Sequence, residues 1–282
     1  MPTARTPDGV DIVYYDLGGS GPPVLLVHAT GFHGMIWQPV ARHLGRHFHC
    51  WPGPPSRRDP AGHGDSGAPA SGDFDWHGFG LDVLSVVDAL DLVRPLAVGH
   101  SLGGAALLSA EQAVPGTLGA LYLYEPAVVT PDRRNSVEGP DMALISRRRR
   151  ARFASRDEAR ANFAAKEPMA SFAPESLAVY VEYGFADADD GSVVLKCRPE
   201  HESAVFSGFA DTDIFERYGE VGCPVTLVHG GAMEHQKANM ALQASRLPRA
   251  RVAVVEGLGH LGPMEDPRRV AEAIAADLAP FD

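Results

Sequence analysis

The segment Leu96–Leu108 has the sequence LAVGHSLGGAALL, and it decides the fold of the chain. Before Ser101 it is apolar, as in a short buried strand, and after Ser101 its apolar residues continue into a helix. Gly99 and Gly103 flank the serine in the pattern Gly-x-Ser-x-Gly, which is typical of a sharp turn between a strand and a helix. Because glycine lacks Cβ, glycine at these positions lets the neighbouring backbone approach the turn. The segment therefore predicts a serine hydroxyl at a helix N-terminus, where free N–H groups favour an oxyanion.

The composition is that of an ordinary globular protein. Of its residues, 45% are hydrophobic and 22% are charged, which is ordinary for such a protein. The length of 282 residues lies within the range of a single α/β domain that carries an insertion. The formal net charge of −11 argues against a nucleic-acid partner. The three cysteines are far apart and form no Cys-x-x-Cys pair, so we expect neither a disulfide framework nor a zinc site. The first residues form no apolar signal segment and no apolar run is long enough to span a membrane, so we expect a cytoplasmic protein without a membrane partner. We also expect neither a metal nor a cofactor.

Strands and helices alternate on both sides of the serine segment. Several apolar segments do not alternate with polar residues, as in parallel strands that are buried on both faces. Strands are expected at about residues 24–28, 47–51, 118–124, 225–229 and 250–255, with an edge strand at 10–17. Helices are expected at about residues 37–44, 75–90 and 237–247 and at the end of the chain. This alternation predicts an α/β fold with a doubly wound, mostly parallel sheet.

Residues 129–218 interrupt the alternation. This part of the chain is polar with helical periodicity, and none of its segments resembles a buried strand. Because it is too long for a structureless loop, we expect a helical cap inserted into a core made of residues 1–128 and 219–282. Four aromatic residues line the substrate cavity from above or form the core of the cap, and both possibilities stay open: Tyr180, Tyr183, Phe185 and Phe206.

Further motifs accompany the serine segment. Trp37 stands nine residues after His28, Asp59–Ser66 has the pattern Asp-x-x-Gly-His-Gly-x-Ser, and Gly259 precedes His260 near the end of the chain. With these motifs the chain resembles the α/β-hydrolase fold family over nearly its whole length, with the cap inserted after the sixth core strand. The resemblance implies a catalytic triad whose members follow in the order Ser, Asp or Glu, and His.

The chain departs from the family pattern just before the Asp59 motif. Family members usually continue directly from the fourth strand into Asp-x-Arg-Gly. Here the Pro-rich segment Pro52–Arg58 intervenes, and Ala61 stands where arginine is usual. We expect an irregular surface excursion at these residues.

The candidate base is His260. A serine hydroxyl is a weak nucleophile, so Ser101 needs a base that accepts its proton and an acid that orients the base. His260 has glycine neighbours and directly follows the predicted strand at 250–255. It therefore lies at the carboxyl ends of the strands, where open α/β sheets bind ligands.

Two carboxylates compete for the role of the acid. Glu234 lies in the loop after the strand at 225–229, where the family usually places its acid, but Met233 stands in place of the commoner aspartate. Glu125 ends an apolar strand, directly before Pro126, where an unpaired carboxylate is costly. We favour Glu125 and expect it at about 2.6–3.2 Å from a ring nitrogen of His260, with Glu234 in solvent. Both remain candidates.

The resemblance also implies an oxyanion hole, which needs two backbone N–H groups. One is that of Leu102, which follows the nucleophile. The other comes from the loop after His28, where alignment on His28 and Trp37 points to Thr30. Phe32 and His33 in the same loop line the acyl pocket or, equally for Phe32, pack in the core.

The predicted cap begins with a basic run, Arg147–Arg150, followed by Arg152. Such a run recognises an acidic substrate or partner, or it is a solvated helix face. We favour the solvated face, because runs of like charge are usually exposed.

The sequence therefore predicts a serine hydrolase that cleaves an ester or lactone of a small, largely apolar substrate through an acyl-enzyme. Two alternatives remain: a C–C bond hydrolase of a dioxo acid, which similar capped members are, and a non-catalytic ligand receptor of the same fold. Dehalogenase and epoxide hydrolase relatives carry aspartate where Ser101 stands, which disfavours those activities. Haloperoxidase-like behaviour without a cofactor would be a side activity of the same site.

Overall fold

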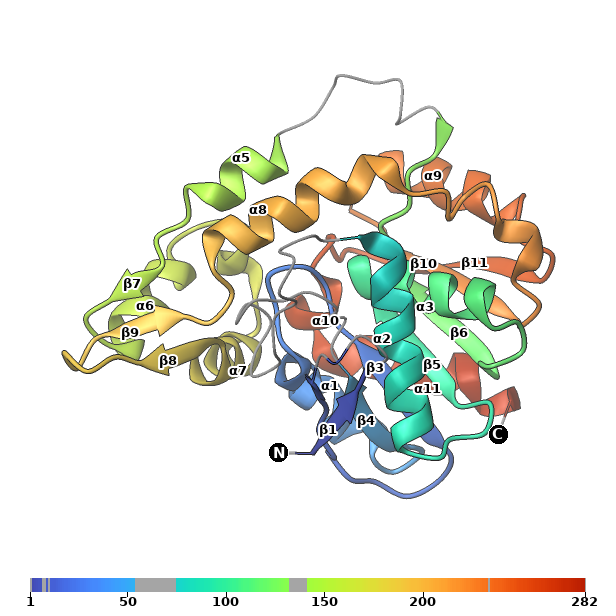
Figure 1. The fold of residues 1–282 in the computed structure, drawn as a ribbon, viewed down its shortest axis with the longest axis horizontal. Helices are drawn as coiled ribbons and strands as arrows, with labels where there is room; N and C mark the ends of the chain where they lie inside the picture. Colours follow the sequence, from blue (N-terminus) through green and yellow to red (C-terminus); the bar gives the residue numbers. More distant parts are fainter. Residues whose placement is uncertain are drawn as a thin grey trace.

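The computed structural model describes residues 2–6, 9, 11–53, 75–131, 141–232 and 234–281. Within these ranges, six strands pair into one parallel sheet in the order β11-β10-β6-β5-β3-β4 (Figure 1). The strands are β3 (Pro23–Val27), β4 (His49–Gly53), β5 (Leu96–His100), β6 (Ala120–Tyr124), β10 (Val225–Gly230) and β11 (Ala250–Val255). The doubly wound α/β fold that the sequence predicts is thus confirmed, and each strand lies within a few residues of its predicted position.

The strand order places the end of β5 at the middle of the sheet. The chain passes from β3 outward to β4, returns to β5 on the other side of β3, and then continues through β6 and β10 to β11. The direction of winding therefore reverses between β3 and β5. In open α/β sheets, ligands bind outside the carboxyl ends of the strands at such a reversal. Ser101, directly after β5, lies at this point.

Helices cover both faces of the sheet. On one face lie α2 (Trp76–Ala89), α3 (Leu102–Ala113) and α9 (Glu234–Ala244), and on the other lie α1 (Gln38–Leu44) and α11 (Pro267–Leu278). Successive side chains of a strand point to opposite faces. Accordingly, Val24 and Leu26 of β3 pack in the cluster with α1 and α11, whereas Leu25 and Val27 pack in the cluster with α2 and α3. This two-sided burial explains the unbroken apolar sequence of the strands.

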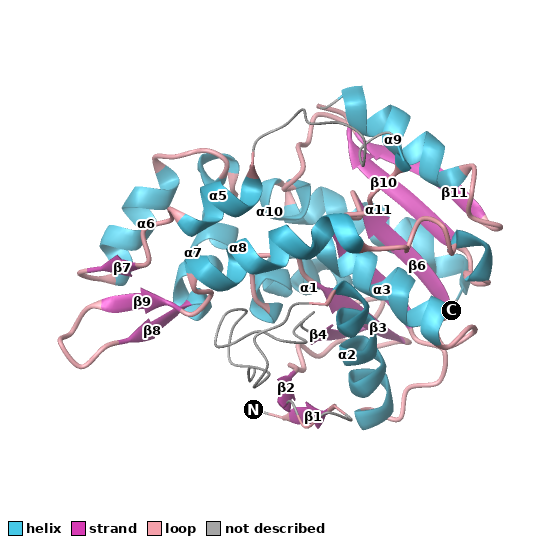
Figure 2. Ribbon diagram, turned by 45° about the horizontal axis from the view of Figure 1, so that its top comes forward, coloured by secondary structure: helices cyan, strands magenta, loops and turns pink. Residues whose placement is uncertain are grey.

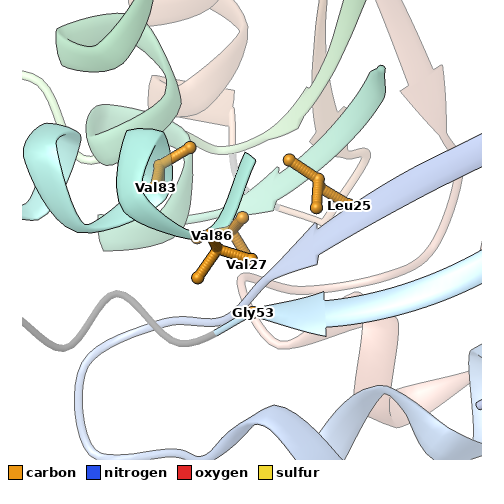
Figure 3. A pocket seen from close by; sticks show the side chains of 5 residues that line it. All are labelled: Leu25, Val27, Gly53, Val83 and Val86. Atoms are coloured by element: carbon orange, nitrogen blue, oxygen red, sulfur yellow. The ribbon is translucent and has the colours of Figure 1, made fainter. Parts of the chain in front are cut away.

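A small recess lies between β3 and α2 (Figure 3). Its lining is apolar throughout and contains none of the candidate catalytic residues: Leu25, Val27, Gly53, Val83 and Val86. We therefore attribute it to packing in the core rather than to ligand binding.

The predicted edge strand at residues 10–17 is divided between two pairings. Within it, β2 (Asp11–Val13) pairs with β1 (Thr3–Arg5) in a separate antiparallel sheet. Farther along, the N–H of Leu17 donates to the carbonyl of Cys50 in β4 at 3.0 Å. Gly18 and Gly19 have φ angles of 71° and 116°, so the backbone leaves the extended conformation here and the pairing with β4 ends.

The insert between β6 and β10 extends to one side of the central sheet (Figures 1 and 2). It contains α5 (Met142–Arg147), α6 (Arg156–Ala164), α7 (Pro174–Gly184) and α8 (Pro199–Ser207). It also contains an antiparallel sheet of β7 (Arg152–Phe153), β9 (Val193–Leu195) and β8 (Phe185–Asp187). The sequence predicts the helices but misses these strands, because two or three residues are too few to show a strand period. The limits of the cap at 129 and 218 stay a prediction.

Some sequence features lie outside the described residues. They are Pro54–Arg58 of the Pro-rich segment, the Asp59–Ser66 motif with Ala61, and Met233. Among the helices that are described, none has the length and apolar character needed to cross a membrane.

Candidate active site

Ser101 occupies a strained turn between β5 and α3. Its φ and ψ angles are 52° and −116°, a combination that residues with a Cβ rarely adopt. A Cβ added to Gly103 would lie 2.1 Å from the carbonyl oxygen of Val27, and one added to Gly99 would lie 2.7 Å from the backbone of Gly104. No side chain fits at either contact, so the two glycines are the residues that allow the turn to form.

The two candidate oxyanion donors lie on neighbouring strand ends. Leu102 is the first residue of α3, so its N–H has no acceptor within the helix. Thr30 lies in the loop after β3 and is buried. The close approach of Gly103 to Val27 holds the start of α3 against the beginning of this loop. The arrangement is compatible with an oxyanion hole, and the role of both N–H groups stays a prediction.

The imidazole of His260 contacts the carboxylate of Glu125. His260 Nδ1 lies 2.7 Å from Glu125 Oε2, within the range expected for an acid that orients a base. The Glu125 side chain is only 1% exposed, and its Oε1 accepts the N–H of Gly230 at 3.1 Å. When Nδ1–H donates to the carboxylate, Nε2 is left as a proton acceptor.

Glu234 lies elsewhere. It is the first residue of α9, its side chain is 90% exposed, and it lies 4.0 Å from the ammonium group of Lys237. An exposed pair at this separation contributes little to stability. Of the two candidate acids, the structure thus brings Glu125 to His260 and leaves Glu234 at the surface.

Two residues that the sequence analysis does not single out hold the loop of His260. His100 Nε2–H donates to the carbonyl of His260 at 2.8 Å, and the two imidazole rings lie 5.1 Å apart. The hydroxyl of Tyr124 donates to the carbonyl of Gly259, also at 2.8 Å. Each donor is the last residue of an apolar strand and directly precedes a candidate catalytic residue, Ser101 or Glu125. That position is the signal by which they could be found.

A third contact completes the support of this loop. Glu265 in α10 (Gly262–Glu265) accepts the N–H of Gly259 at 2.7 Å. A Cβ added to Gly262 would lie 2.1 Å from the Tyr124 hydroxyl, so only glycine lets the tyrosine reach its acceptor. The backbone of His260 is therefore fixed from β5, β6 and α10.

Both supporting donors, His100 and Tyr124, are neutral side chains that retain the hydrogen they donate. Burial lowers the pKa of His100 well below its ordinary value, and the nearby His260 lowers it further. With its pKa lowered, His100 stays neutral and keeps its Nε2–H on the carbonyl of His260. Burial also raises the pKa of Tyr124 above its ordinary range, with Glu125 adding to the shift. The phenol therefore stays a neutral donor.

Residues of the insert pack over the loop that carries Thr30. The ring of Phe32 meets those of Phe172 and Tyr180, with centroids 6.1 and 5.6 Å apart. Tyr183 lies near His33, at 6.2 Å between ring centroids. Tyr180 and Phe185 are buried in the same apolar cluster as Phe32.

The basic run divides into exposed and inward-facing members. Arg147, Arg148 and Arg150 are exposed, and Arg150 pairs with Glu158. Arg152 is also exposed and pairs with Asp190. Arg149 is different, because its side chain turns toward the loop after β3. The run is therefore largely the solvated face that we favour, with one exception.

Over the residues that the structure describes, no group of three or more His, Cys, Asp and Glu residues could hold a metal ion.

Comparison with known families settles what kind of protein this fold and site belong to. The profile of the Alpha/beta hydrolase family matches residues 24–273, from β3 to α11. The chain belongs to the alpha/beta hydrolase family. It is therefore an enzyme, and the alternative of a non-catalytic receptor is not retained.

Individual relatives are distant. The non-heme chloroperoxidase CPO-A1 of Kitasatospora aureofaciens is 26% identical over 270 residues, which are 92% of each chain. An uncharacterized protein of Mycobacterium tuberculosis is 30% identical over 118 residues, which are 42% of this chain and only 33% of that relative. Among solved structures, a thermophilic esterase from Thermogutta terrifontis has a TM-score of 0.73 at 22% identity, covering 99% of this chain and 98% of that chain. The last likeness shows the fold alone.

The low pKa of His100 predicts a pH dependence of stability in this alpha/beta hydrolase. Below a pH of about 6.5 the unfolded chain binds a proton at His100, whereas the native chain binds it only at a lower pH, because its pKa is lowered. The stability that neutral His100 provides is thus present above this pH and is lost as the pH falls. One such proton lowers the free energy of unfolding by up to about 1.4 kcal/mol per pH unit. His100→Gln, which can donate an N–H without titrating, is expected to reduce this slope.

The measurement is urea unfolding between pH 7.5 and 5 of the wild type, His100→Gln and a control. His235→Gln, at an exposed position of α9, is the matched control and is expected to leave the slope as in the wild type. A slope for His100→Gln equal to that of the wild type would show that His100 titrates in the native protein as it does in the unfolded chain.

Proposed function

We propose that this alpha/beta hydrolase is a serine hydrolase that cleaves an ester or a lactone of a small, largely apolar substrate. The observation that carries the proposal is the contact of 2.7 Å between His260 Nδ1 and Glu125 Oε2. This contact fixes the tautomer in which Nε2 accepts a proton. The loop of His260 is bound to His100, the residue directly before Ser101, so base and nucleophile belong to one constellation.

The proposed reaction has two halves. His260 Nε2 takes the proton of the Ser101 hydroxyl as Oγ attacks the substrate carbonyl, and the protonated imidazole then gives this proton to the leaving alcohol. Water, activated in turn by His260, attacks the resulting acyl-enzyme and releases the acid. In both halves the N–H groups of Leu102 and Thr30 would stabilise the negative charge on the carbonyl oxygen.

The surroundings of the loop after β3 support an apolar substrate. Phe32, Phe172 and Tyr180 are buried together where the insert meets this loop. Such aromatic surfaces bind apolar groups and leave orientation to a few polar atoms. The likeness to CPO-A1 over most of both chains further supports haloperoxidase-like behaviour as a side activity of the same site. Cleavage of a C–C bond in a dioxo acid uses the same three residues and would be found by testing such an acid beside the esters.

Ser101→Ala is expected to lower turnover of a short p-nitrophenyl ester by a factor on the order of 10³ or more, because only binding and oxyanion effects remain without the nucleophile. A fluorophosphonate probe is expected to label the wild type at Ser101, as read by peptide mass spectrometry. Ser245→Ala, at an exposed position, is the control and should keep full labelling. Labelling that persists in Ser101→Ala would refute the assignment of the nucleophile.

Substitution of each carboxylate by an amide distinguishes the two candidate acids by the loss of activity. Glu125→Gln cannot hold His260 in the required tautomer, so we expect a loss of about 10⁴-fold in kcat, by analogy with the same change in a serine-protease triad. Glu234→Gln removes an exposed charge and is expected to be nearly silent. The measurement is ester hydrolysis by both variants, with folding checked by circular dichroism. A severe loss in Glu234→Gln together with a mild one in Glu125→Gln would move the acid to the loop after β10.

A further inference from the structure

Arg149 is the inward-facing member of the basic run. Its side chain is 18% exposed, whereas Arg147, Arg148 and Arg150 lie exposed at the surface. Its Nη1 forms an ion pair with Glu202 of α8, whose side chain is 8% exposed, and its Nη2 donates to the hydroxyl of Tyr180 at 2.7 Å. The pair therefore connects the end of α5 with α7 and α8 across the insert.

This ion pair lies directly against the loop that carries Thr30. The next residue, Gly31, has a φ angle of 80°, and a Cβ added to it would lie 2.6 Å from Glu202 Oε1 and 3.3 Å from Arg149 Nη1. The two charged side chains thus pack on the bare Cα of Gly31. This contact needs glycine for both the conformation and the space.

Tyr180 contacts the same loop at the following positions. Its carbonyl lies 3.2 Å from Nε2 of His33, and its ring lies edge-on to Phe32. Residues 31–33 are therefore all in contact with the Arg149–Glu202–Tyr180 group of the insert. Thr30, the candidate oxyanion donor, directly precedes them in the chain.

We propose that Arg149 and Glu202 are positioning residues, through which the insert holds the loop of Thr30 in the geometry that stabilises the oxyanion. The inference rests on the proposed function. A displacement of a fraction of an ångström at a donor weakens transition-state stabilisation, so the loop needs rigid support from outside. A buried ion pair adds little net stability, but its directional hydrogen bonds specify one arrangement of the groups that it joins.

The same contacts argue against Arg149 as the binding site for an acidic substrate. Its charge is balanced by Glu202, and a substrate carboxylate beside Nη1 would approach the Glu202 carboxylate as well. Burial would lower the pKa of Arg149, but Tyr180 and Glu202 outweigh this effect and hold its pKa above the ordinary range. The guanidinium therefore stays charged and paired.

The test compares Arg149→Met and Glu202→Gln with the wild type in kcat and KM for a p-nitrophenyl ester and in inhibition by a trifluoromethyl ketone. Loss of one oxyanion donor costs about 10²–10³-fold in kcat, so a displaced donor should cost about 10–100-fold. KM should change little, because the donor acts mainly on the transition state. The affinity for the ketone, which forms an oxyanion on the serine, should fall by a factor similar to that of kcat.

Two further variants keep the result interpretable. Arg148→Met, at the exposed neighbouring position, is the matched control and should retain the kcat and inhibition of the wild type. The double variant Arg149→Met/Glu202→Leu replaces the pair by apolar side chains, which is often neutral or favourable for stability. It is expected to keep the melting temperature within a few degrees while kcat stays low.

The proposal is overturned if the folded double variant has kcat and ketone inhibition within about twofold of the wild type. It is also overturned if only KM rises, because the pair would then act on substrate binding. Failure of the proposed function looks different, since the wild type itself would then neither hydrolyse the esters nor take up the fluorophosphonate at Ser101.

Discussion

The candidate site depends on the contacts of one carboxylate, that of Glu125, which is buried at the end of an apolar strand. An isolated charge in this position would be costly, and Glu125 avoids that cost through two partners. Its Oε1 accepts the N–H of Gly230 at the end of β10, and its Oε2 meets Nδ1 of His260 after β11. Because the three strands are neighbours in the sheet, one side chain joins the ends of all of them. The candidate base is thereby held by contacts that join the strand ends of the sheet.

The same edge of the sheet gathers the other components. β3 and β5 are adjacent where the direction of winding reverses, so the loop of Thr30 and the turn of Ser101 lie side by side. The missing Cβ of Gly103 allows the start of α3 to touch β3. Residues of the insert pack on the loop of Thr30, with the Arg149–Glu202 pair against Gly31. Strained and buried polar groups are concentrated here, as is common at catalytic sites.

The elements whose signal is local can be predicted from the sequence. Gly99, Ser101 and Gly103 predict the turn because the pattern spans only five residues, although the contact that excludes a Cβ at Gly103 is with Val27 of β3. The unbroken apolar strands likewise predict a sheet that is covered on both faces. The sequence favours Glu125 over Glu234 as the partner of His260 but does not decide between them. The contact depends on which strands are neighbours in the sheet, and the sequence does not show that. The sequence preceding Pro126 was enough to favour it, since a charge ending an apolar strand needs a partner.

What the sequence could not show depends on contacts between distant segments. His100 and Tyr124 donate to backbone carbonyls of residues far along the chain, and a carbonyl carries no residue-type signal. Arg149 belongs to a run of arginines, and only the fold shows which of them turns inward. The strands β7, β8 and β9 pair with one another and not with the central sheet, and each is too short to have a recognisable period.

A crystal structure of the enzyme after reaction with a fluorophosphonate would show whether Ser101, His260 and the two N–H groups act at one site, since the adduct imitates the tetrahedral intermediate. The account predicts the phosphonyl group on Ser101 Oγ, with one of its oxygens about 2.7–3.1 Å from the backbone nitrogens of both Leu102 and Thr30. It also predicts that His260 Nδ1 remains on Glu125 while Nε2 faces the adduct. A phosphonyl oxygen directed away from these two nitrogens, or His260 turned from Glu125 to another carboxylate, would contradict it.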